Sequence, residues 1–185
     1  MKFTRIAGGR TSHHGFSLLE LIIVMTVTLV IAVVAVPSVR NTLAAYRGPA
    51  AVQGIASQLS LTRMRAGARF TRTRLTLDTA NNAYQRELYD KASSAYQIDG
   101  GVQPLANGVS FGFGNIAVPA GGQSAIQQST QVIFNSRGIP VDGAGTPTGD
   151  YAVYVASDGS YFAVTINTAG QVRTWKYSGS AWVAQ

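Results

Sequence analysis

The sequence contains no cysteine, and its only two histidines, His13 and His14, lie within the first 15 of 185 residues. Without cysteine, no disulfide holds the fold together and no thiol acts as a nucleophile or metal ligand. Serine is present, but a serine nucleophile needs a base, and no histidine after residue 15 supplies one. We therefore expect a non-enzymatic protein without a metal ion or cofactor.

Acidic residues are also scarce: there are eight, against 15 Lys and Arg, which gives a net charge of +7. Without the first 15 residues, twelve basic residues remain against the eight acids, an excess too modest for a dedicated nucleic-acid binder. Asp142, Asp150 and Asp158 lie in or beside glycine-rich loops. They do not form a run of the roughly six to eight oxygen ligands that calcium requires, so we interpret them as turn-capping residues.

Apolar residues are concentrated in one stretch near the N-terminus. Between Phe16 and Val36, 17 residues are apolar, and the exceptions are Ser17, Glu20, Thr26 and Thr28. As a helix this stretch would be about 30 Å long, which is enough to cross a bilayer. Glu20 is its single charge, and a lone carboxylate in hydrocarbon is costly unless it finds a partner. Glu20 is therefore a candidate functional residue.

The segments on either side of this stretch differ from it in character. Residues 1–15 are polar and basic and contain no acid. Because Lys and Arg stay on the cytoplasmic side, this segment predicts that everything after Pro37 crosses the membrane. Pro37 lacks a backbone N–H and clashes with the preceding turn, so we expect it to kink or locally melt the helix.

Residues 37–69 have the pattern of an amphipathic continuation of the helical spine. Five residues at steps of three and four share one face, which is expected to pack against the rest of the chain: Val52, Ile55, Leu59, Thr62 and Ala66. Gly48 and Pro49 interrupt this segment. We therefore expect a bend or a new helix start near Pro49.

From residue 70 to residue 185 the pattern changes to the alternation of β-strands. In the first strand Thr73, Leu75 and Leu77 face one way, while Arg72, Arg74 and Thr76 face the other. A turn at 79–82 and a return strand at 83–89 complete a hairpin. Further strands are predicted at 109–113, 131–135, 151–156, 161–166 and 171–177, with a short one near Trp182. Residues 91–108, 114–130 and 140–150 are interpreted as loops. The predicted fold class is α+β, with a long hydrophobic N-terminal helix followed by an antiparallel β-sheet head.

The junction at residue 15 resembles the class III signal of type IV pilins and pseudopilins. The resemblance rests on Gly15, on Phe16 directly after it, on Glu20 as the fifth residue counted from Phe16, and on Pro37 after a β-branched and leucine-rich span. It implies a pilin-like fold, removal of the leader 1–15 by a prepilin peptidase that cuts after Gly15, and N-methylation of Phe16. It also implies that residues 16–36 are retained as a transmembrane and assembly helix.

The same resemblance implies polymerisation through packing of these helices. Cleavage leaves a positive amine on Phe16, one helical turn from Glu20. Pairing of Glu20 with the amine of a neighbouring subunit would offset the desolvation of both charges and set the axial register of the polymer. The implied partners are other pilin or pseudopilin subunits, the prepilin peptidase, the inner-membrane assembly platform and membrane lipid. In the family, a proline at the place of Pro37 is associated with a flexible or non-helical part of the spine.

Three short segments further along look like the GspH/FimT family, the minor pseudopilins of type II secretion and minor pilins of type IV pili. The segments are residues 61–63 (Leu-Thr-Arg), residues 133–138 (Ile-Phe-Asn-Ser-Arg-Gly) and residues 164–173, which begin Val-Thr-Ile-Asn and end Gln-Val-Arg. This looser resemblance implies a minor subunit at the tip or start of a filament.

A cluster of arginines before and within the first predicted strand is the other candidate site: Arg63, Arg65, Arg69, Arg72 and Arg74. No acid lies between Glu20 and Asp78, so these cations, with Arg40 and Arg47, have no acidic neighbour in sequence. We favour a solvated helix end whose cations complement the helix C-terminus and pair with neighbouring subunits. The alternatives are phosphate binding, meaning DNA uptake, and docking to anionic lipid. For DNA, the resemblance adds Arg173 and Lys176.

The predicted function is that of a minor pseudopilin or minor type IV pilin, inserted in the bacterial inner membrane by a single span. The leader is cytoplasmic and the head, residues 70–185, is periplasmic before incorporation into the filament. Two alternatives remain: a DNA-binding minor pilin for natural transformation, and a membrane-anchored protein that never polymerises. The sequence does not decide between a type II secretion system and a type IV pilus.

Overall fold

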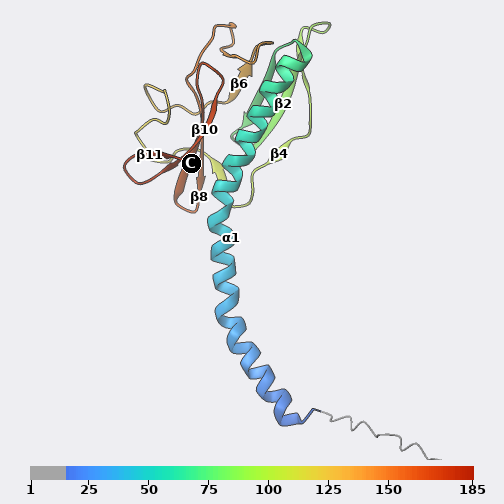
Figure 1. The fold of residues 1–185 in the computed structure, drawn as a ribbon, viewed down its shortest axis with the longest axis vertical. Helices are drawn as coiled ribbons and strands as arrows, with labels where there is room; N and C mark the ends of the chain where they lie inside the picture. The colour runs from blue at the N-terminus through green and yellow to red at the C-terminus, as the bar shows by residue number, and fades with distance from the viewer. Residues whose placement is uncertain (1–15) are drawn as a thin grey trace, which may run out of the picture. The chain divides into compact units, whose positions relative to one another are not determined.

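A computed structural model describes residues 16–185 and contains one long helix and eleven strands in that range. The helix, α1, runs from Leu18 to Arg69. By compactness the chain divides after Asn41, and the second unit, Thr42–Gln185, contains the C-terminal part of α1 and all the strands. Figure 1 shows that part of α1 lying along the strands. The predicted α+β class is confirmed.

α1 is helical without interruption through both Pro37 and Pro49. The predicted local melting at Pro37 and the predicted helix start near Pro49 are therefore wrong. Each proline removes one backbone N–H but keeps a φ that suits a helix, so the neighbouring hydrogen bonds continue the helix past it. At Pro49 the tertiary structure also helps, because the adjacent Gly48 and the nearby Val52 are buried.

The first sheet, sheet A, is formed around the predicted hairpin. It has the order β3-β2-β1-β6-β7, with β4 also paired to β2, and its pairs are antiparallel. Its strands are β1 (Thr73–Asp78), β2 (Ala83–Asp90), β3 (Ala95–Ile98), β4 (Gln103–Pro104), β6 (Gln131–Phe134) and β7 (Pro140–Val141). The hairpin of β1 and β2 and the strand β6 occur where they were predicted. The loop predictions for 91–108 and 140–150 are wrong in part, because β3 and β4 lie in the first range and β7 in the second.

The second sheet, sheet B, contains the predicted three-stranded meander. It has the order β11-β10-β9-β8-β5, again antiparallel. Its strands are β5 (Val109–Phe111), β8 (Tyr151–Ser157), β9 (Ser160–Ile166), β10 (Val172–Tyr177) and β11 (Trp182–Ala184). All five were predicted, with ends that differ by one or two residues. The segment 114–130 contains no strand, as expected.

The main core lies between α1 and the two sheets. The predicted helix face is buried as expected: Val52, Ile55, Leu59, Thr62 and Ala66 have no exposed surface. Leu75 of β1, Phe134 of β6 and Val164 of β9 belong to the same apolar cluster. Burying one large aliphatic side chain of this kind contributes about 1.5–3 kcal/mol, so this face is what holds the helix to the sheets.

A second, smaller apolar cluster covers the other face of sheet B. Tyr154 of β8 is fully buried there, with Ala120 and Ile126 of the segment 114–130 and with Trp175 and Trp182. The Tyr154 hydroxyl accepts a hydrogen bond from the Ala120 N–H (3.0 Å) and donates one to Gln123 Oε1 (2.6 Å). The strandless segment is therefore part of the folded structure and not a free loop.

Candidate functional site

The start of α1 is formed by residues that satisfy the first turn of the helix. Ser17 precedes the helix, and its Oγ accepts a hydrogen bond from the Leu19 N–H at 3.3 Å, as an N-cap residue does. Glu20 lies three residues further on, at the position where an acid complements the positive end of the helix dipole. Phe16 is 82% exposed at the first described position. Gly15, the predicted cleavage position, lies outside the described residues, as do His13 and His14.

The first part of α1 presents apolar side chains that nothing in the described chain covers. Every residue from Phe16 to Leu43 is exposed, although most are apolar. α1 contains an 18-residue window with a mean hydropathy of 2.8, so one helix of the described chain is long and apolar enough to cross a membrane. Within residues 16–185, Glu20 takes part in no ion pair. The helix therefore exposes an apolar surface with one unpaired carboxylate.

Arg63 connects three parts of the chain that are distant in sequence. From α1 its guanidinium donates to the carbonyl oxygens of Gly138 (3.0 Å), Gly170 (3.0 Å) and Ala169 (3.1 Å). The first carbonyl belongs to the turn after β6 and the other two to the turn after β9. These are the three segments, residues 61–63, 133–138 and 164–173, that carry the GspH/FimT resemblance. Their common role in this structure is to join α1 to both sheets.

The two turns that Arg63 binds have the same construction. Asn135 and Asn167 each begin a turn in which the side-chain oxygen accepts two backbone N–H groups. Gly138 and Gly170 end these turns with φ of 72° and 75°, a region that favours glycine. Both glycines lie close to the Arg63 side chain: a β-carbon would lie 3.1 Å from Arg63 Cγ at Gly138, and 2.8 Å from the Gly138 carbonyl oxygen at Gly170.

Arg74 lies in a polar network on sheet A. Its Nε pairs with Glu87 Oε2, its NH1 donates to Gln131 Oε1 at 3.3 Å, and its guanidinium lies 4.0 Å from the ring centre of Tyr96. Gln85 donates a further hydrogen bond to Glu87. Glu87 is buried, so Arg74 neutralises a carboxylate of its own chain, and sequence proximity did not reveal this pair because it joins two strands.

Asp99 forms ion pairs with two more arginines, Arg65 and Arg86, and Arg86 was not among the candidate residues predicted from the sequence. Arg86 of β2 donates to Asp99 Oδ2 at 2.9 Å and to Gln58 Oε1 of α1 at 3.1 Å. Arg65 Nε lies 3.9 Å from the same carboxylate oxygen. Arg65 is therefore only loosely paired, while Arg86 ties β2 to both the helix and the segment after β3.

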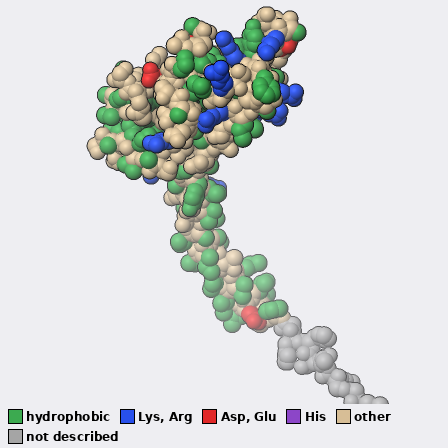
Figure 2. All heavy atoms as spheres, turned by 45° about the horizontal axis from the view of Figure 1, so that its top comes forward, with side chains coloured by type: hydrophobic (Ala, Val, Ile, Leu, Met, Phe, Trp, Pro, Cys, Tyr) green, Lys and Arg blue, Asp and Glu red, His purple; other side chains and the backbone are tan. Residues whose placement is uncertain are grey.

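The other two members of the arginine cluster lie at the C-terminal end of α1. Arg69 is the last helical residue and Arg72 comes just before β1, and both are exposed. Figure 2 shows several Lys and Arg side chains grouped over one end of the head. Arg47 donates to the Asn107 carbonyl at 3.2 Å, and Arg40 belongs to the first unit of the chain. The five clustered arginines thus divide into an internal set and an exposed pair.

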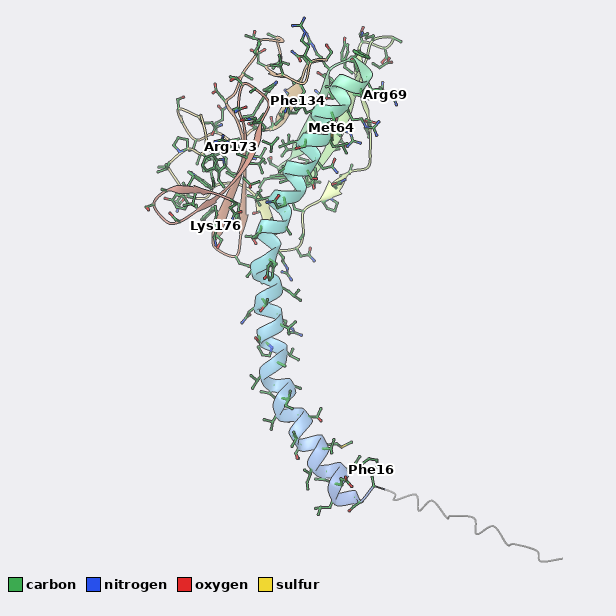
Figure 3. The ribbon with its side chains drawn as sticks, in the orientation of Figure 1. Phe16, Met64, Arg69, Phe134, Arg173 and Lys176 are labelled. Carbon is green, nitrogen blue, oxygen red and sulfur yellow. The ribbon has the colours of Figure 1, made fainter. Side chains whose placement is uncertain are left out.

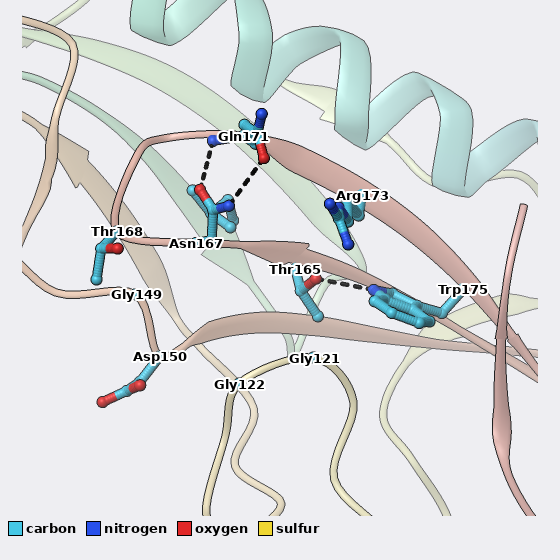
Figure 4. Close-up of a pocket in the computed structure, with 11 residues that line it drawn as sticks. Gly121, Gly122, Gly149, Asp150, Thr165, Asn167, Thr168, Gln171, Arg173 and Trp175 are labelled. Atoms are coloured by element: carbon cyan, nitrogen blue, oxygen red, sulfur yellow. Dashed lines mark hydrogen bonds between the residues drawn. The ribbon is translucent and has the colours of Figure 1, made fainter.

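Arg173 and Lys176 lie on β10, as Figure 3 shows, whereas Arg69 lies at the end of α1. Arg173 borders a surface cavity of about 450 Å³ formed by the ends of β9 and β10 and by two glycine-containing loops. In that cavity the Trp175 indole N–H donates to Thr165 Oγ1 (2.8 Å), and Asn167 bonds Gln171, as drawn in Figure 4. β10 therefore carries its cations apart from the end of α1.

Two acidic side chains of the loops, those of Asp142 and Asp90, hydrogen-bond to their own turns. Asp142 Oδ1 accepts the Thr146 N–H at 2.8 Å, and Asp90 accepts N–H groups of Ala92 and Ser93. The hydrogen bond from the Ser93 hydroxyl is the main reason why the pKa of Asp90 lies below its ordinary value. Asp158 lies in the turn between β8 and β9. Within residues 16–185 no three His, Asp or Glu side chains are grouped as metal ligands would be.

Comparison with known proteins gives a family match for the N-terminal part of the chain. Among curated proteins none matches the chain. Two solved structures are similar, both of the minor pseudopilin EpsH from the type 2 secretion system of Vibrio cholerae, each with a TM-score of 0.49 and with 14% and 15% sequence identity. Each alignment covers 69% of this chain, and 95% and 92% of the two solved chains. Residues 10–36 match the prokaryotic N-terminal methylation motif, which confirms the resemblance to type IV pilins and pseudopilins in this part of the chain.

Proposed function

We propose that this protein is a minor pseudopilin or minor type IV pilin, a structural subunit that polymerises through its N-terminal helix. One observation carries the proposal: in residues 16–36, the described part of the methylation motif, an exposed apolar helix surface contains a single carboxylate, Glu20, which has no ion-pair partner in residues 16–185. Such a surface needs both a lipid environment and a cationic partner. Packing against the N-terminal helices of other pilin or pseudopilin subunits in the membrane supplies both.

The partner of Glu20 in this proposal is the N-terminal amine of a neighbouring subunit. A prepilin peptidase removes residues 1–15 after Gly15, and the new amine of Phe16 is then methylated but still carries a positive charge. Glu20 lies one helical turn from Phe16, so pairing between subunits fixes their stagger along the filament axis. Burial of the two charges together is tolerated where burial of either alone is not.

The proposal also gives the location and the partners of the protein. The basic residues before Gly15 keep that end in the bacterial cytoplasm, and the β-rich head lies in the periplasm. The inner-membrane assembly platform takes up the processed subunit, and other pilin or pseudopilin subunits pack against α1. In its maturation the chain is the substrate of an enzyme and not an enzyme itself.

Two measurements test the proposal. Mass spectrometry of the protein from its native membrane should give a chain that begins with a methylated Phe16. The variant Glu20→Ala should be cleaved and inserted normally but should not form helix-to-helix crosslinks between subunits. The N-terminal amine of the neighbouring subunit then has no carboxylate with which to pair. Thr28→Val, which removes a polar group from the same helix without a charge, should assemble normally.

The outcomes separate the alternatives. A protein that still begins at Met1, or that is trimmed beyond Val36, contradicts the proposal. A correctly cleaved protein that never crosslinks to other subunits is a non-polymerising membrane anchor. Loss of secretion or loss of pili on deletion of the protein distinguishes a type II secretion pseudopilus from a type IV pilus.

A further inference from the structure

The end of α1 contains a residue whose conformation and exposure are both unfavourable. Phe70 follows the last helical residue and has a φ of 50°, in the left-handed region. Its N–H bonds the Gly67 carbonyl (3.3 Å), and the Thr71 N–H bonds the Ala66 carbonyl (3.3 Å). This pair of hydrogen bonds is the Schellman motif, in which the residue at the place of Phe70 is usually glycine. A phenylalanine there is strained.

The ring of Phe70 gains little burial from the fold. It is 77% exposed and belongs to neither apolar cluster of the head. A glycine at this position would end the helix with the same hydrogen bonds and without the strain. The side chain therefore contributes little to the stability of the isolated head. A strained backbone conformation that exposes an aromatic ring is typical of binding surfaces.

The surroundings of Phe70 are cationic and include a second aromatic ring. Phe70, Arg72, Tyr89 and Lys91 border one open cavity of about 530 Å³, together with polar side chains of the turn after β6, Asn135 and Ser136. Arg69 directly precedes Phe70 in sequence. Rings, cations and small polar groups thus face one space large enough for a nucleotide.

Arg72 and Lys91, which line this cavity, and Arg69, which precedes Phe70 in sequence, form no ion pair within the described chain. The three ion pairs of residues 16–185 are Arg65–Asp99, Arg74–Glu87 and Arg86–Asp99. None of them includes Arg69, Arg72 or Lys91. The acids nearest in sequence to the cavity's lining residues, Asp90 beside Lys91 and Asp142 before Gly145, direct their carboxylates at backbone N–H groups of their own turns. Arg69, Arg72 and Lys91 therefore remain available to an external anion.

We propose that Phe70 and the cations around it form a binding site for single-stranded nucleic acid. An unpaired base stacks on the exposed ring of Phe70, while Arg69, Arg72 and Lys91 contact the phosphates on either side of it. A duplex keeps its bases stacked inside the helix and offers nothing to the ring, so the site discriminates against it. This site keeps Arg69 and Arg72 of the arginine cluster and leaves out Arg63 and Arg74, which are committed to contacts within the fold. It does not depend on the proposed role in a filament.

The test uses the full-length protein in detergent micelles and a fluorescently labelled oligothymidylate, with binding followed by anisotropy at several salt concentrations. Phe70→Gly should bind about tenfold more weakly, since stacking on one aromatic ring is lost, while its melting temperature stays the same or rises. Phe70→Leu should lose as much affinity, because leucine is apolar but cannot stack. Arg72→Gln should lower the slope of log affinity against log salt by about 0.7, the value for one phosphate contact on a single strand.

Matched controls decide between this site and a general attraction of anions. Arg173→Gln removes another exposed cation elsewhere on the head and should leave the affinity within about twofold of the parent. Absence of binding at low salt, or a duplex of the same length that binds as tightly, overturns the proposal. So does a Phe70→Leu variant that binds as the parent does. That result indicates that Phe70 makes an apolar contact without base stacking, as it would with a protein partner whose acidic groups pair with the cations.

Discussion

At the scale of single residues, Arg63 shows how one side chain can hold separate elements together. A planar guanidinium carries five N–H donors in a fixed geometry, so a single arginine can satisfy several carbonyls at once. Here it serves two turns, one from each sheet, whose carbonyls would otherwise point at the helix without donors. Lysine has the same charge but presents it as a point, so it cannot reproduce this contact.

We predict that Arg63→Ala lowers the free energy of unfolding by about 2–3 kcal/mol, because charge-assisted hydrogen bonds are lost and the carbonyls are left without donors. Arg63→Lys should recover less than half of that loss. Chemical denaturation followed by circular dichroism measures both. Arg69→Ala, an exposed arginine of the same helix, is the control and should change the stability by no more than about 0.5 kcal/mol. Equal effects of the two alanine variants would contradict the role given to Arg63.

Tyr154 leads to a prediction about alkaline pH. Burial raises the pKa of its phenol above the ordinary value. A group whose pKa is higher in the folded state favours folding below its unfolded pKa, and this contribution is lost as the pH rises through the folded value. The head should therefore lose stability above about pH 10, the ordinary pKa of tyrosine.

Tyr154→Phe should weaken this pH dependence of stability without abolishing it, because burial also raises the pKa of Tyr84 and Tyr151. Denaturation midpoints measured across that pH range check it; an unchanged slope in the variant would count against the assignment.

At the scale of secondary structure, α1 is defined by its buried face more than by its helix-breaking residues. The three- and four-residue steps from Val52 to Ala66 were sufficient to predict which side is buried. Pro49 misled because its effect is local, while the packing of Gly48 and Val52 holds the turns around it. Pro37 misled because its fixed φ suits a helix and it removes only one backbone N–H. β3, β4 and β7 were missed for the opposite reason: each is short and exists only because β2 or β6 lies beside it.

Two glycines of α1 give opposite predictions from the same substitution. A β-carbon on Gly48 would collide with the ring of Phe162, which is itself buried in the core, whereas one on Gly67 would meet nothing within 4 Å. Gly48→Ala should therefore destabilise the head by about 1–3 kcal/mol despite the better helix propensity of alanine. Gly67→Ala should stabilise it by up to about 1 kcal/mol. Thermal unfolding of the two variants in parallel measures the contrast, and the same sign for both would show that the helix does not pack as described.

At the scale of the whole chain, the sequence was sufficient to recognise the N-terminal methylation motif but not the surface of the head. Gly15, Phe16 and Glu20 are close in sequence, so their pattern can be recognised directly. The five clustered arginines do not form one site, because Arg63 and Arg74 find partners more than ten residues away in regions that pair through the sheets, while Arg69 and Arg72 stay exposed. Phe70 was not predicted as a candidate residue, because its distinguishing features are a positive φ and an exposed ring, and the sequence shows neither.

The division of the chain after Asn41 predicts that the head folds without the membrane segment. No residue between Phe16 and Leu43 is buried, and the first buried position of α1 is Gly48. A chain that begins at Thr42 should therefore be monomeric in water and should unfold cooperatively, with a melting temperature within a few degrees of the full-length protein in detergent.

A chain that begins at Gln53 lacks Gly48 and Val52, so it leaves Phe162 and the end of the core uncovered. Loss of Val52 alone should cost about 2 kcal/mol or more, because a buried aliphatic side chain is removed and a cavity opens. Circular dichroism melts of the two truncated chains test the division: if the one that begins at Thr42 is unfolded or aggregates, residues 16–41 contribute to the fold of the head.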